Sequence, residues 1–189
     1  GDPSELNEVI RQFPFTEDEA FRDSIDGSLF NVGQIYEQIQ YNDELFPNPV
    51  VRGNFVWKEG VQDTEVVFKP DVKGRFRIAW MPPTEMRNLK KFEQNKRIAP
   101  NAELGVGGVD SYDLDATVDG RGSKGALHLY NKFHMEHPSN MFVLEYASRP
   151  PLAKIFYEDC LMAAVFYGYP LLIENNKYGI ARYFETRGY

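Results

Sequence analysis

The sequence predicts a mixed α/β fold whose second half follows the order strand, strand, strand, helix, strand, helix. Three observations predict this order. Short apolar segments separated by polar or glycine-rich turns fill residues 106–146, which is typical of consecutive β-strands. Residues 151–168 place apolar side chains at helical spacing and end in Gly168, a residue that favours a helix C-terminus. A further apolar strand over 170–174 and a helix that begins at Gly179 complete the core.

Length and composition support a folded domain. The 189 residues suit one medium-sized domain, or a small domain with an extension. Because 42% of the residues are hydrophobic and 14% aromatic, the chain can build a core, which excludes a disordered or collagen-like class. The single cysteine, Cys160, excludes a disulfide scaffold and fits a reducing compartment. No apolar run approaches the roughly 18 residues that span a membrane, and no signal peptide opens the sequence, so we expect no membrane partner.

Residues 1–49 are predicted to form a helical segment with loops. Thr16 suits a helix N-cap, and Glu19, three residues later, completes a capping box. Residues 29–41 carry apolar side chains on one helical face, and the proline-containing run 46–49 ends that helix. The first 50 residues hold 2 basic and 11 acidic side chains, a net charge of −9.

Residues 50–100 are predicted to form a β-rich linker subdomain. Residues 50–57 and 66–68 are apolar strand candidates. Residues 75–80 alternate basic or small side chains with large apolar ones, as a half-buried strand does. Residues 84–97 are polar and basic, and we predict that they are helical.

Positive charge is concentrated in one segment. The whole chain carries a net charge of −7, but residues 73–97 hold 8 basic and 2 acidic side chains, a net charge of +6. A local basic face sets the field where a partner binds, so an acidic chain does not exclude a nucleic-acid partner. The alternative is a solvated lysine-rich surface, which charge alone favours.

Two acids end two of the predicted core strands. Three strands joined by short connections should be antiparallel neighbours, and a helical crossover should make the fourth strand parallel to its partner. Asp110 ends the first strand and Glu174 ends the fourth. If these strands lie side by side, both carboxylates meet at one edge of the sheet, where open sheets place their sites.

Paired carboxylates at a sheet edge are suited to divalent cations. Their hard oxygen atoms are the ligands that Mg²⁺ and Mn²⁺ prefer. Two such ions about 4 Å apart can hold the attacking and leaving oxygens of an in-line phosphoryl displacement. In this hypothesis Asp110 is the central ligand, and Glu174 completes one ion's shell or orients the water. The structural alternative is that acids at strand ends are solvated or cap the next turn.

Several segments together resemble the nuclease domain of phage terminase large subunits, which has the RNase H-like fold and cuts concatemeric DNA during packaging. They are Gly108–Asp113, Arg121–Ala126, Glu145–Pro150 and Leu172–Asn176. The run 13–21 is similar to the segment that closes the ATPase domain of those proteins. The resemblance implies an ATPase-domain end over 1–49, a linker over 50–100 and a partial RNase H-like nuclease domain over 101–189. No GxxxxGK[ST] motif occurs, so the packaging ATPase itself is not in this sequence.

The resemblance implies the site residues. Asp110 matches the metal ligand of the first strand, and Glu174 matches that of the fourth. The family also uses a third acid on a later element, and nothing in 180–189 fits that role. We therefore expect a nuclease domain truncated at its C-terminus, and the sequence does not give the position of the third acid.

The family often places one more acid after the first-strand turn, where this sequence has Ser123. Asp113 or Asp115 could take that place as a metal ligand, and the sequence does not choose between them. These departures leave open whether this chain is itself an active hydrolase.

Basic residues near the same elements are candidates for binding DNA phosphates. They are Arg121, Lys124, Arg149 and Lys177. The glycine-rich hairpin that holds the first two is equally compatible with a plain polar turn, and the resemblance favours DNA.

Other chemistry-bearing residues have simpler explanations. His134 and His137 lie in a loop, and zinc needs three or four protein ligands, so surface histidines are favoured. Cys160 lies on the apolar face of its helix, which favours a small core residue over a nucleophile. Glu158 and Asp159 lie on the same helix, where some RNase H-like enzymes carry a ligand, but a solvated helix face is favoured.

Two main hypotheses follow. The first is a metal-dependent endonuclease domain that cuts double-stranded DNA with two Mg²⁺ or Mn²⁺ ions, in a packaging protein of the host cytoplasm whose partners are the terminase ATPase domain, the small terminase subunit and the portal. The second is a non-catalytic DNA-binding or docking module whose acidic first 50 residues contact the packaging motor. A weaker alternative is an unrelated α+β domain with accidental acids at its strand ends.

Overall fold

The computed structural model describes residues 31–45, 50–94, 96–112, 122–174 and 178–189. The chain divides into two compact units, Gly1–Asn48 and Pro49–Tyr189. The described part of the first unit is helix α3 (Val32–Leu45), where the sequence predicted a helix over 29–41. The Asn31 side chain accepts a hydrogen bond from the backbone N–H of Gln34 at 3.1 Å and so caps this helix. The predicted capping box at Thr16 lies outside the described residues.

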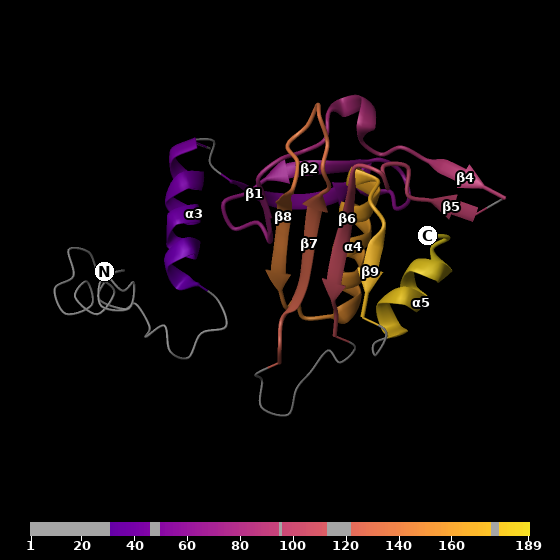
Figure 1. The fold of residues 1–189 in the computed structure, drawn as a ribbon. Helices are drawn as coiled ribbons and strands as arrows, with labels where there is room; N and C mark the ends of the chain where they lie inside the picture. Colours follow the sequence, from indigo (N-terminus) through magenta and orange to yellow (C-terminus); the bar gives the residue numbers. More distant parts are fainter. Residues whose placement is uncertain (1–30, 46–49, 95, 113–121, 175–177) are drawn as a thin grey trace, which may run out of the picture. The chain divides into compact units, whose positions relative to one another are not determined.

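The second unit is built on one seven-stranded sheet with the order β2-β1-β3-β8-β7-β6-β9 (Figure 1). The strands are β1 (Val51–Trp57), β2 (Val66–Pro70), β3 (Phe76–Ile78), β6 (Gly105–Asp110), β7 (Gly125–Asn131), β8 (Met141–Ser148) and β9 (Leu171–Ile173). Neighbouring strands are antiparallel except β6 and β9, which are parallel.

The second half of this unit has the element order that the sequence predicts. Strands β6, β7 and β8 are consecutive antiparallel neighbours, and helix α4 (Ala153–Tyr167) leads the chain back to β9. Helix α5 (Tyr178–Thr186) follows. Gly168 ends α4 in the left-handed conformation, with φ 69°, and its N–H bonds to the carbonyl of Ala164 at 2.8 Å. The α/β class and the adjacency of the strands that carry Asp110 and Glu174 are confirmed.

Strands β1 to β3 belong to the same sheet as the later strands. Strand β3 pairs with β8, with Phe76 opposite Tyr146 and Ile78 opposite Leu144. Residues 50–100 therefore share a sheet and a compact unit with residues 101–189. A 3-10 turn, Lys58–Gly60, begins the connection between β1 and β2.

The prediction of a helix over residues 84–97 is wrong. A 3-10 turn (Thr84–Met86) is followed by a separate hairpin of β4 (Lys91–Glu93) and β5 (Lys96–Ile98). Asn88 adopts a left-handed backbone, with φ 56°, which interrupts any helix. Its side chain exchanges two hydrogen bonds with the backbone of Val66, at 2.8 and 3.0 Å. A tertiary contact to β2 therefore decides the local conformation.

Helix α4 packs on one face of the sheet, which we call the inner face, and lies behind β6 in Figure 1. Aromatic rings fill this layer: Tyr146 stacks on Phe76 at 4.6 Å and on Phe156 at 5.3 Å between ring centroids. Gly125 lets α4 approach closely, because a Cβ there would lie 2.5 Å from the ring of Phe156. Cys160 is fully buried here, as predicted, and burial raises the pKa of its thiol well above the usual range.

The opposite, outer face of the sheet carries the alternate residues of each strand. Along β6, Gly105, Gly107 and Val109 are buried against the inner layer, while Gly108 and Asp110 are exposed. Helices α4 and α5 both contribute to the inner-face core. Within the described part of Pro49–Tyr189, neither helix covers the outer face.

Candidate functional site

Asp110 and Glu174 lie at equivalent positions of two paired strands. In the parallel register of β6 and β9, Val109 is opposite Ile173, so the next residue of each strand is one of the two acids. Val109 and Ile173 pack on the core, and the alternation of side chains sends both carboxylates toward the outer face. Both acids are exposed. The structure thus brings the predicted carboxylates to one end of the sheet, and their role as metal ligands stays a prediction.

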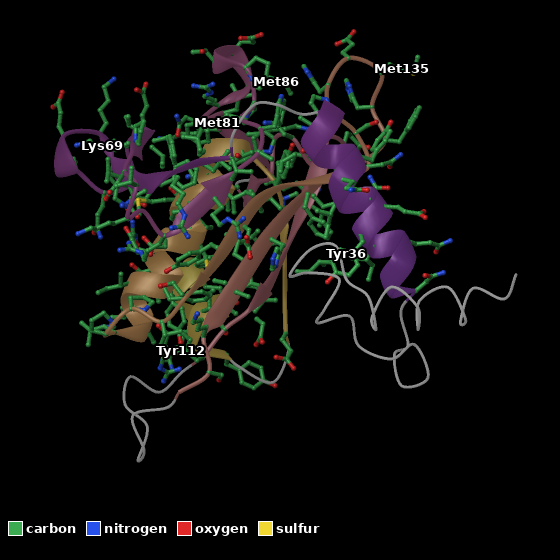
Figure 2. The ribbon with its side chains drawn as sticks, turned by 90° about the vertical axis from the view of Figure 1, so that its left-hand side faces the viewer. Tyr36, Lys69, Met81, Met86, Tyr112 and Met135 are labelled. Atoms are coloured by element: carbon green, nitrogen blue, oxygen red, sulfur yellow. The ribbon has the colours of Figure 1, made fainter. Side chains whose placement is uncertain are left out.

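The same end of the sheet receives the start of β7 and the end of β8. Asp110 is opposite Ala126, and Gly125 is opposite Ser148. Lys124, which directly precedes β7, is exposed there. Figure 2 marks this end by Tyr112, while Met135 lies at the other end of the strands. Lys124 is therefore placed where its side chain could reach a phosphate bound near the two acids.

Arg149 has a structural role at this end. Its Nη1 donates a hydrogen bond to the carbonyl oxygen of Ser123 at 2.5 Å, and its guanidinium lies 4.2 Å from the ring centre of Tyr112. A Cβ on Gly122 would lie 2.3 Å from the same guanidinium. Arg149 therefore joins the chain leaving β6 to the chain entering β7, and its contact with DNA stays a prediction.

Tyr112 is held from two further directions. Its hydroxyl donates to the carbonyl of Pro150 at 3.1 Å, and its own carbonyl accepts from the hydroxyl of Tyr157 at 2.8 Å. Between Asp110 and Tyr112, the hydroxyl of Ser111 is buried and has no hydrogen-bond partner among the described residues. The backbone that carries Asp110 is thus fixed on its C-terminal side, two residues from the carboxylate.

The remaining predicted site residues lie outside the described residues. They are Asp113, Asp115, Arg121 and Lys177. Within the ranges that the structure describes, no group of three or more histidine, cysteine or acidic side chains is arranged to hold a metal ion. Carboxylates such as Asp110 and Glu174 are the ligand type that a hydrated Mg²⁺ or Mn²⁺ takes, one or two at a time with several waters, and a metal ion at this pair stays a prediction.

Asp159 is not on a solvated helix face, so that prediction is wrong. Its side chain is 3% exposed and accepts hydrogen bonds from Arg75 Nε and Nη2, both at 2.9 Å, and from the Tyr146 hydroxyl at 2.7 Å. Burial raises the pKa of Asp159 above its ordinary value, and the bonds from Arg75 and Tyr146 oppose that rise. Its carboxylate oxygens are used in joining α4 to Arg75, just before β3, and to Tyr146 of β8.

Glu158, the neighbouring acid, is engaged as well. Its Oε1 accepts from Trp57 Nε1 at 2.5 Å and from Gln62 at 3.1 Å. Its Oε2 accepts from Tyr183 and, at 2.7 Å, from Arg187. Burial opposes ionisation, but the hydrogen bonds outweigh it and lower the pKa of Glu158. The Glu158 carboxylate is therefore used to join three segments of the protein, and not to bind a metal ion.

Arg187 extends this network to the connection between β1 and β2. Its Nη2 and Nε bond to the carboxylate of Asp63 at 2.7 and 3.1 Å. Burial raises the pKa of Tyr183 to about 12, so its hydroxyl remains a donor to Glu158 at neutral pH. The network fixes α5, which begins four residues after Glu174. Sequence reasoning missed it because residues 63, 158 and 187 share no spacing or motif.

Comparison of the chain with protein-family models, with curated proteins and with solved structures gives no match in any of the three. The resemblance to terminase nucleases therefore stays a hypothesis that rests on the residues named above. In the described part of the chain, no helix is both long and apolar enough to cross a membrane.

Proposed function

We propose that this chain is part of a metal-dependent DNA endonuclease. The observation that carries the proposal is the parallel pairing of β6 and β9, which places Asp110 and Glu174 at equivalent exposed positions on one end of the sheet. Open sheets place functional sites at the carboxyl ends of their strands, and these two acids end theirs.

Each residue has a role in this proposal. Two divalent ions would supply an activated water and neutralise charge on the leaving oxygen. Asp110 would serve as the central ligand, and Glu174 would complete one coordination shell or orient the attacking water. Lys124 would hold a neighbouring phosphate, and Arg149 holds Tyr112 and Ser123 in place near Asp110. Phosphodiester hydrolysis then needs little contact with the bases, which is consistent with little sequence preference.

The biological setting follows from the resemblance. In the sheet, β8, β7, β6 and β9 lie in the order that the strand-helix pattern led us to expect, which supports an RNase H-like core over 101–189. We accordingly assign the chain to the nuclease region of a phage packaging terminase that acts on double-stranded DNA in the host cytoplasm. Its partners would be the ATPase domain, the small subunit and the portal.

A specific observation favours a second candidate function. The described residues hold two acids at this end of the sheet and no group of three metal-ligating side chains. A chain with an incomplete ligand set would bind DNA, or dock within the packaging motor, without cutting.

Nicking of supercoiled plasmid in Mn²⁺ tests the first candidate against the second. We expect the wild-type chain to nick and the Asp110→Asn variant to lose at least 100-fold in rate, because removing one charged ligand weakens ion binding and charge stabilisation together. The matched control is Glu103→Gln, an exposed acid just before the other end of β6. Plasmid that stays intact with the wild-type chain, while a labelled duplex is still bound, supports the non-catalytic module. Equal nicking by all three proteins rejects the site.

A further inference from the structure

Three aromatic side chains gather on the outer face of the sheet. His128 and Tyr130 on β7 each lie against Phe142 on β8, with ring centroids 5.8 and 5.2 Å apart. We call these three residues the aromatic platform. Phe142 is 62% exposed, so the platform is not part of the core. Large aromatic side chains are costly to leave in water, so a group of them on an open sheet face indicates a binding surface.

The platform shares a hollow with Asp110 of the candidate site. An open depression of about 730 Å³ on the outer face is lined by Asp110 at one end and by the platform at the other. Its floor is made of small residues: a Cβ on Gly108 would meet no atom within 4 Å, and Ala126 lies opposite Asp110. Leu172 on β9, which is 70% exposed, forms another side. At about 3.4 Å per residue, His128 lies roughly 7 Å along β7 from the position opposite Asp110.

Cations lie on strands and at a strand start near the hollow, outside its lining. Lys124 is at the Asp110 end, and on the far side Arg52 of β1 is directly opposite Arg77 of β3. Like charges at opposed positions repel, and Arg77 is balanced by an ion pair with Glu145 at 2.8 Å. Glu145 also lines the hollow, so its charge there is paired, and Arg52 adds a further cation beyond it. The surface thus offers cations at its margins and aromatic faces in between.

We infer that the aromatic platform stacks unpaired bases of the DNA strand whose phosphate lies at Asp110 and Glu174. The inference rests on the proposed nuclease function and adds that the substrate is single-stranded, or locally opened, next to the cut. Flat aromatic faces beside cations are the general means of binding single strands without sequence preference. An intact duplex keeps its bases stacked and presents phosphates, which Phe142 cannot bind.

Binding of a labelled oligothymidylate, compared with a duplex of equal length and in chelator so that no cleavage occurs, tests this inference. Phe142→Ala should raise the Kd for the single strand about 5- to 150-fold, the loss typical of one stacked base. Phe142→Leu, which keeps apolar bulk without a ring, should be similarly weakened. The matched control is Phe92→Ala on β4, since Phe92 is also 62% exposed but belongs to the separate hairpin.

The outcomes separate this inference from the proposed function. Single-strand binding that depends on Phe142 but not on Phe92 supports the platform, even if the wild-type chain fails to nick plasmid. Nicking that depends on Asp110, together with unchanged single-strand affinity in Phe142→Ala, overturns the platform and leaves the nuclease standing. Self-association that Phe142→Ala abolishes, seen by sedimentation, would assign the face to a second copy of the chain and also overturn it. Thermal unfolding of each variant verifies that the exposed substitutions leave the fold intact.

Discussion

The two faces of the sheet use their acidic residues in opposite ways. On the inner side, Asp159 and Glu158 are enclosed by donors from β1, β8, α5 and Arg75, which precedes β3, and they hold the layers together. On the outer side, Asp110 and Glu174 are exposed at the strand ends. From the sequence, the two carboxylates on the helix were expected to be solvated and the two at the sheet edge to bind metal, and the helix pair is instead enclosed. The comparison shows that the surroundings decide the role: a buried acid enclosed by donors contributes stability, and an acid exposed at a strand end is accessible to a ligand from solvent.

The largest expected effect comes from removing the buried acid. Asp159→Ala should lower the free energy of unfolding by about 3 kcal/mol, because Arg75 and Tyr146 lose their acceptor inside the protein. Partial exposure of the Arg75 side chain, 36%, keeps the loss at the lower end for a buried ion pair. Urea denaturation of the variant measures it, with Glu103→Ala as a surface control that should change by less than about 0.5 kcal/mol. Equal stability of the two variants would remove the distinction between the faces.

Alanine substitutions of glycines on the two faces give a second test of this comparison. Gly125→Ala should cost about 1–3 kcal/mol, because its Cβ would lie 2.5 Å from the ring of Phe156 in a packed layer. Gly108→Ala on the outer face has open space and should be neutral, or stabilise by up to about 1 kcal/mol through the unfolded chain. Thermal or urea unfolding of both variants gives the difference. A cost at Gly108 as large as that at Gly125 would show that something covers the outer face.

The Glu158 network predicts a pH dependence. The folded-state pKa of Glu158 is lowered from its ordinary 4.5, so its stabilisation is present above 4.5 and is lost as the pH falls through the folded value. Glu158→Gln should therefore destabilise the protein at neutral pH, and the gap to the wild-type chain should shrink below pH 4.5. Unfolding measured from neutral pH downward follows the gap. A gap that is constant with pH would contradict the assignment.

The smallest expected effect is at the candidate site. Asp110→Asn and Glu174→Gln should each change the free energy of unfolding by no more than about 0.5 kcal/mol in the absence of divalent ions, since both acids are exposed. With Mn²⁺ added, the wild-type chain should gain thermal stability that neither variant gains, because only the native pair binds the ion. Equal thermal shifts for all three proteins would place the ion elsewhere.

Sequence patterns predicted much of the core and the placement of the acids. The strands of 106–146, the helix that ends at Gly168 and the adjacency of the Asp110 and Glu174 strands follow from local periodicity and from the rules of strand connection. The metal-ligand role of the acids was also predicted from sequence, and it remains to be measured. The helix expected over 84–97 failed because the Asn88 side chain bonds to β2, a contact that no local pattern encodes.

By itself, then, the sequence determined which residues form the core strands and helices, and that two of the strands end in an acid, because these features depend on neighbours within a few positions. Only the tertiary structure decided that β3 joins β8, that Arg75 meets Asp159, and that Glu158 and Arg187 lie together. Those contacts join residues far apart along the chain, and their stability comes from shared burial of charges and rings that no periodicity reveals. For the same reason, the aromatic platform became visible only once β7 and β8 were paired on an open face.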